Sequence, residues 1–276
     1  MSDFSLTSTV RIPAVAGVFY PEDADDLRTT IEGLLHTAEV GVGLPTRPKA
    51  LIVPHAGYPY SGPVAAAAYK HLELLHASIK RIVIVGPSHR VYLQGVAVPR
   101  VRGFATPLGE VPIDVEGRNQ LLARGDILAS DTPHEFEHSL EVQLPFLQVV
   151  IDAFTVLPLV VGSTTATQLA SILDDVWGGD ETLIIASSDL SHYHPYAAAQ
   201  ELDATTAQAI VGRHVDITHD QACGASAING LLTVARRRGL QVTEIAGQNS
   251  GDTAGDAVRV VGYGAFAIHA QRFTSQ

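Results

Sequence analysis

Three short runs of apolar, β-prone residues recur along the chain, and a histidine comes within a few residues of the end of each run. The runs Ala50–Val53, Ile82–Val85 and Leu183–Ala186 lead to His55, His89 and His192. Uninterrupted apolar runs of this length are typical of strands buried on both faces of a parallel sheet. Because ligands and catalytic groups gather at the carboxyl ends of such strands, the pattern predicts a metal or acid–base site built from these imidazoles.

Helical patterns alternate with further strand patterns over the rest of the chain. We expect helices at 23–37, 62–75, 114–124, 139–151, 164–177, 196–213 and 222–238, and further strands at 95–98, 155–161, 182–187, 242–246 and 258–267. Strands that alternate with helices imply right-handed crossovers. The pattern therefore predicts an α/β fold, with a mainly parallel central sheet and helices on both faces. We expect a single domain over residues 1–276, with its core at about 11–269.

The composition of the chain bears on whether it binds nucleic acid, contacts a membrane or is secreted. The chain has 276 residues, 46% of them hydrophobic, and a net charge of −11. An acidic chain lacks the basic face with which nucleic-acid-binding proteins displace counterions. We find no signal peptide and no apolar run long enough to span a membrane, which predicts a cytoplasmic protein without membrane contact. Cys223 is the sole cysteine, and we expect it to be a buried structural residue.

His55 and His89 form the candidate metal-ligand pair, because neutral imidazoles at neighbouring strand ends are frequent metal ligands. The segment 245–256 comes after a fourth apolar strand and holds the nearest carboxylates. Two histidines and one carboxylate form the facial triad of non-haem Fe(II) oxygenases. Asp252 is therefore the candidate third ligand, with Ser250 and Asp256 as alternatives. An ordinary turn rich in Asn, Gly and Asp is the competing interpretation.

His192 is the candidate acid–base residue. Asp189 precedes it by three residues and is predicted to orient its ring, which would raise its basicity. A serine nucleophile at Ser188 or Ser191 is a weaker alternative, because the chain lacks the G-x-S-x-G elbow of α/β hydrolases.

Residues 134–138 read His-Glu-Phe-Glu-His and match the H-E-x-x-H signature of zinc proteases. That signature requires a continuous helix, which Pro133 and Pro145 would interrupt. We expect instead that His138 and Glu141 reach the site from a loop or a helix start.

Six ordered motifs resemble the Memo family, whose bacterial and archaeal members are often called AmmeMemoRadiSam system protein B. They are Pro54-His55-Ala56-Gly57-Tyr58, Gly86-Pro87-Ser88-His89, Thr106-Pro107-Leu108-Gly109, Glu137-His138-Ser139-Leu140-Glu141, residues 157–162 and residues 187–192. The family is similar in fold to the class III extradiol dioxygenases, which hold Fe(II) with two histidines and a glutamate. The resemblance implies that His55 and His89 are metal ligands, His192 is the acid–base residue, and His138 is a further site histidine.

Three hypotheses about function are consistent with these residues. The first is a non-haem, metal-dependent, dioxygenase-like oxidoreductase of unknown substrate, with Fe(II) as the first choice of metal and Zn, Mn or Cu as alternatives. In it His192, Asp189 and His138 act in catalysis, while Tyr58, Tyr60, Ser88 and Glu141 line the substrate pocket. The second is a non-catalytic module that binds a peptide or small ligand on the same scaffold, and the third is a metal-dependent hydrolase. We expect a small molecule or peptide in the pocket and consider a homo-oligomer.

Overall fold

The computed structural model describes residues 9–39, 43–44 and 46–271. Within these residues, nine strands form a central sheet in the order β10-β12-β2-β9-β3-β8-β4-β7, with β11 paired to β12. The strands of this sheet are β2 (Pro48–Val53), β3 (Arg81–Pro87), β4 (Val96–Val98), β7 (Ile127–Ala129), β8 (Thr155–Val161), β9 (Thr182–Ser187), β10 (His192–His194), β11 (Gln241–Asn249) and β12 (Val260–His269). A second, three-stranded sheet contains β1 (Val10–Arg11), β5 (Gly103–Thr106) and β6 (Gly109–Pro112).

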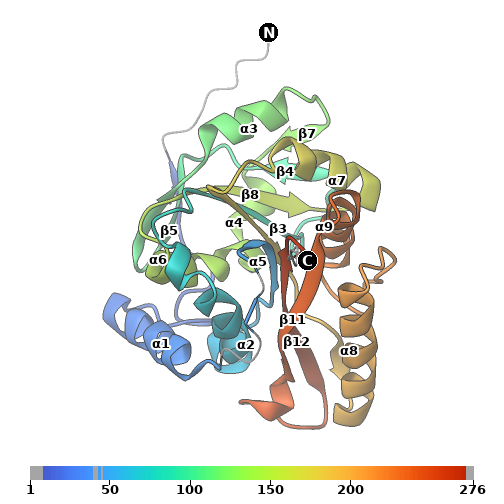
Figure 1. Ribbon diagram of the computed structural model, residues 1–276. Coiled ribbons are helices and arrows are strands. Elements are labelled where there is room, and N and C mark those ends of the chain that lie inside the picture. Colours follow the sequence, from blue (N-terminus) through green and yellow to red (C-terminus); the bar gives the residue numbers. More distant parts are fainter. Residues whose placement is uncertain (1–8, 40–42, 45, 272–276) are drawn as a thin grey trace, which may run out of the picture.

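The helices connect these strands and cover both faces of the central sheet (Figure 1). They are α1 (Ala24–Thr37), α2 (Tyr58–Lys70), α3 (Val115–Leu122), α4 (Thr132–Glu135), α5 (His138–Glu141), α6 (Gln143–Val150), α7 (Ala166–Asp175), α8 (Tyr196–Val211) and α9 (Ala225–Arg237), with short 3₁₀ turns at η1 (Glu73–Leu75) and η2 (Ser250–Asp252). The predicted α/β class, with a central sheet flanked by helices, is confirmed. None of the helices in the described residues is long and apolar enough to cross a bilayer.

Successive side chains of the central strands point to opposite faces of the sheet and pack into two separate hydrophobic cores. Leu51, Ile84 and Ile185 pack with α1, α2 and α6 on one face, whereas Ile52 and Val85 pack with α7, α8 and α9 on the other. This alternation explains why the strands read as continuous apolar runs. Helices α1 and α7 begin at side-chain caps that satisfy free backbone N–H groups.

The middle four strands of the sheet are parallel to one another, and β4 and β7, at one edge of the sheet, form a further parallel pair. Strands β2, β9, β3 and β8 are parallel neighbours, while β12 pairs antiparallel to β2 and β4 pairs antiparallel to β8. The expectation of a mainly parallel sheet thus holds for the centre and for the β4–β7 pair, whereas the other pairs are antiparallel. Since the carboxyl ends of these four strands lie along one edge, the residues directly after them meet there.

Candidate metal centre

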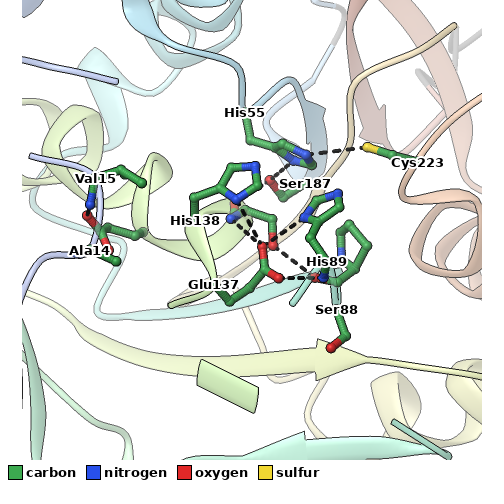
Figure 2. A network of polar contacts seen from close by, with 12 residues as sticks. Ala14, Val15, His55, Ser88, His89, Glu137, His138, Ser187 and Cys223 are labelled. Carbon is green, nitrogen blue, oxygen red and sulfur yellow. Dashed lines mark hydrogen bonds and ion pairs between the residues drawn. The ribbon is translucent and has the colours of Figure 1, made fainter. Parts of the chain in front are cut away.

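Three histidines converge at the carboxyl edge of the parallel strands. His55 comes after β2, His89 comes after β3, and His138 is the first residue of α5. One nitrogen from each ring can be chosen so that all three lie within 4.8 Å of one another. Figure 2 shows the three rings directed toward a common centre.

The tautomer of His55 is set by Ser187, at the end of β9. Ser187 Oγ donates its single hydrogen to the Ser139 carbonyl oxygen (2.6 Å) and accepts from Gln143 Nε2 (2.8 Å). The remaining contact, from His55 Nδ1 at 2.9 Å, can then form only if Nδ1 carries the proton. Nε2 of His55 is therefore unprotonated, the form in which imidazole binds a metal.

Glu137 orients His89 in the same way. Its carboxylate accepts the His89 backbone N–H (2.6 Å) and the His89 Nδ1–H (2.9 Å), together with the Ser139 N–H (2.9 Å). Burial alone would raise the pKa of Glu137, but these hydrogen bonds outweigh it and lower the pKa to about 2. A charged carboxylate thus fixes the Nδ1–H form of His89 and leaves Nε2 free.

His138 completes the cluster with a ring that is largely buried. Its Nδ1 has no hydrogen-bond partner and lies 3.5 Å from Glu137 Oε1. Burial, reinforced by the neighbouring His55 ring, lowers the pKa of His138 to about 4. Burial, reinforced by His89, lowers the pKa of His55 to about 3. Both rings are therefore neutral at physiological pH, as metal ligation requires.

These residues fit a divalent transition metal. Metal–imidazole bonds of about 2.0–2.1 Å put the nitrogens of a tetrahedral site about 3.4 Å apart, so the rings need to close by only on the order of 1 Å. The unpartnered Nδ1 of His138 is a buried polar atom that a ligand or metal would satisfy. An all-imidazole set favours Fe, Cu or Zn over the harder Mn²⁺.

Cys223 also lies at this site, which its sequence position did not reveal. Its Sγ is 3.3 Å from His55 Nε2, and Figure 2 shows it approaching from the side opposite Ser187. Burial, reinforced by the charge of Asp189, raises the pKa of the thiol to about 12. Cys223 and His89 line a cavity of about 320 Å³, together with Ser88 and His219. The only sequence signal was its place two residues before α9.

Similarity to known proteins extends over nearly the whole chain. Residues 11–267 match the family model described as Memo-like protein. MEMO1 family proteins from Sulfolobus acidocaldarius and Methanococcoides burtonii are each 37% identical to this chain; the aligned regions cover 92% and 94% of it, and 97% and 100% of those proteins.

The chain belongs to the Memo family.

A further relative of this Memo-family chain, from Aquifex aeolicus, is 35% identical over 92% of the chain and 97% of its own length. Among solved structures, an uncharacterized protein from Escherichia coli K12 matches with a TM-score of 0.47 and 16% identity, over 77% of this chain and 98% of that chain.

Asp252 does not take the place predicted for the third ligand; the third ring is that of His138. Asp252 caps the short η2 turn, where its Oδ2 accepts the Asn249 N–H (2.9 Å) and its Oδ1 accepts the Tyr196 hydroxyl. The two alternatives also serve the backbone: Ser250 Oγ accepts the Val261 N–H (3.1 Å) and Asp256 Oδ1 accepts the Val258 N–H (2.8 Å). The contacts of these three side chains in the structure are those of an ordinary turn.

His192 lies close to the cluster, but Asp189 does not orient its ring. His192 Nδ1 donates to the Leu190 carbonyl oxygen at 2.8 Å, which leaves Nε2 free. A charge on His192 would lower the pKa of His55. Asp189 instead accepts the His55 backbone N–H (2.7 Å) and so holds the ligand loop. Burial raises the pKa of Asp189.

The residues predicted for the substrate pocket separate into different places. Ser88 lines the cavity beside His89. Tyr58 is buried in the core, with its hydroxyl donating to the Val142 carbonyl (2.9 Å), and Tyr60 is partly exposed on α2. Glu141 is fully buried and pairs with Arg11 at 2.6 Å. Neither Tyr58 nor Glu141 lines the cavity beside His89.

The H-E-x-x-H match is divided between two helices, as the prolines suggested. His134 lies in α4 and His138 begins α5, so the two rings do not share one helical face. His134 packs against Phe104, with ring centroids 6.0 Å apart. A zinc-protease site is excluded at these residues.

Proposed function

We propose that this Memo-family protein binds one divalent transition metal ion at His55, His89 and His138, and that the site serves a non-haem, metal-dependent oxidoreductase reaction on a small molecule. The observation that carries the proposal is the convergence of three neutral imidazoles, of which His55 and His89 have their free nitrogen dictated by a buried acceptor. Fe(II) remains the first choice for redox chemistry, and Zn(II) and Cu suit the same donors. A metal ion held there would supply Lewis acidity and, for iron or copper, one-electron chemistry.

The cavity, His192 and Cys223 would each contribute a different function to this reaction. The cavity of about 320 Å³ beside His89 and Cys223 offers room for a small substrate next to the cluster. His192 Nε2 is free to accept or return a substrate proton, because Nδ1 is held by the Leu190 carbonyl. Cys223 adds a soft donor close to His55, which favours copper or zinc as the competing metals.

Metal analysis tests the binding part of the proposal. Protein purified without oxygen and incubated with Fe(II) or Zn(II) should retain about one equivalent of metal after desalting. H55A/H89A should retain none, whereas H76A, at an exposed histidine paired with Asp152, should match wild type. Equal metal content in wild type and the double variant would refute the site.

Oxygen uptake tests the chemistry separately. The Fe(II)-loaded protein, offered a panel of catechols, should consume O₂ only when His192 is intact, so H192A should retain metal but lose uptake. Turnover of any substrate without O₂ would favour the hydrolase alternative. Metal binding with no turnover of small molecules would favour the binding module.

A further inference from the structure

Arg11, at the end of β1, is a buried arginine held against the loop that carries Glu137 and His138. Its Nε donates to the His134 carbonyl (2.6 Å) and its Nη2 donates to the Glu137 carbonyl (2.7 Å). Its Nη1 pairs with Glu141 at 2.6 Å. One guanidinium therefore binds three acceptors in the segment that runs from α4 to the end of α5.

The loop between α4 and α5 sets the geometry of two rings in the cluster. The Glu137 carboxylate fixes the tautomer of His89, and the next residue, His138, supplies the third ring. The two carbonyls bound by Arg11 belong to Glu137 itself and to a residue three positions before it. A shift of this loop would thus move Glu137 and His138 together.

Only arginine suits this position. A guanidinium presents its donors in a rigid planar fork, whereas lysine concentrates three donors at one nitrogen. The Phe104 ring lies under the guanidinium, 4.9 Å from Cζ to the ring centroid, and restrains the plane of the fork. Lysine would preserve the charge opposite Glu141 but could not reach both carbonyls as well.

We propose that Arg11 is a positioning residue of the metal centre, which it serves by holding the loop that aligns Glu137 with His89 and delivers His138. This inference rests on the proposed metal site. Strand β1 is more than 120 residues away in sequence from this loop. Through Arg11, it helps to hold the metal site in shape.

The test compares R11K with R118K. Arg118 is a matched control, because it is also a buried arginine and its Nη1 donates to the carbonyls of Pro99, Arg100 and Val101, away from the cluster. Titration of Zn(II) should give a Kd at least tenfold weaker for R11K, as is usual when support behind a ligand is lost, and a Kd within about twofold of wild type for R118K. An unchanged Kd in R11K would overturn the inference.

A second readout needs no metal. Long-range proton–nitrogen NMR spectra of the metal-free protein should show His89 wholly in its Nδ1–H form in wild type and R118K, and as a tautomer mixture in R11K. If wild type takes up no zinc, the proposed function fails while this spectrum still decides the role of Arg11; a wild-type spectrum in R11K would overturn it. E141Q, which keeps both carbonyl contacts, should resemble wild type in the spectrum. An E141Q spectrum like that of R11K would assign the effect to Glu141 and overturn the inference.

Discussion

Single hydrogen bonds decide which nitrogen each histidine offers. Ser187 and Glu137 hold the Nδ1–H forms of His55 and His89, so Nε2 of each ring is unprotonated. The sequence predicted His55 and His89 as a pair, because each comes directly after an apolar strand. It could not reveal Glu137 as the partner of His89, since the two are 48 residues apart and meet only through the fold.

Replacing Glu137 with Gln should weaken metal binding. The amide carries no charge and can place an NH₂ group against His89 Nδ1, so the His89 tautomer is no longer dictated. We expect the Zn(II) Kd to rise about tenfold or more by calorimetric titration. E135Q, at an exposed carboxylate two residues away, is the control, and equal Kd values for E137Q and E135Q would contradict the role assigned to Glu137.

His134 should make stability depend on pH. Burial lowers its pKa from 6.5 to about 3, so between these values the unfolded chain binds a proton that the folded chain does not. Stability from this group is therefore complete above about pH 7 and falls as the pH drops through 6.5 toward 3. From pH 7 to pH 5 wild type should lose about 2 kcal/mol relative to H134L. Urea unfolding at both pH values measures this, and an identical pH dependence in the two proteins would refute it.

At the scale of elements, the strand ends explain why His55 and His89 meet as predicted and why Asp252, the predicted third ligand, does not join them. Strands β2 and β3 stop at the carboxyl edge and turn, which brings His55 and His89 together. Strand β11 does not stop there: Ala246 is opposite Ala265, one residue beyond the Phe266–Ile52 pair, and β11 continues to Asn249. Three further residues carry the chain about 10 Å onward, which takes Asp252 past the cluster. A hydrophobic pattern gives the existence of a strand but not how far it overruns its neighbours.

Opposite outcomes are expected for His138 and Asp252. H138A should lower bound metal well below one equivalent, because it removes one of the three clustered nitrogens. D252N should keep wild-type metal content, because its carboxylate caps η2, and should lower stability by about 1 kcal/mol. Elemental analysis of the desalted proteins measures this; metal loss in D252N with retention in H138A would restore Asp252 as the ligand.

At the scale of the whole molecule, the class of fold was readable from the sequence because it depends on periodicity, which is local. Part of the site could be predicted from the sequence, because the edge of a parallel sheet brings together the residues that come directly after its strands. The sequence did not predict the roles of Cys223, Glu137 and Arg11, because each acts at the cluster through contacts between segments that are distant in sequence. The assembled site should therefore exist only in the folded chain.

Metal binding should accordingly stabilise the folded protein. At free Zn(II) of 100 times its Kd, the free energy of unfolding should rise by about 2.7 kcal/mol, and a chelator should reverse the rise. Thermal unfolding of wild type with and without zinc measures this, with H55A/H89A as the control. A shift of equal size in the double variant would place the stabilising ion elsewhere.

The most direct measurement is a crystal structure of the protein loaded with Fe(II) without oxygen, with anomalous data at the iron edge. We expect one anomalous peak about 2.0–2.2 Å from Nε2 of His55, from Nε2 of His89 and from a ring nitrogen of His138. An empty cluster in crystals loaded at saturating Fe(II), or a peak at Asp252 and not at the three histidines, would contradict the proposed metal centre.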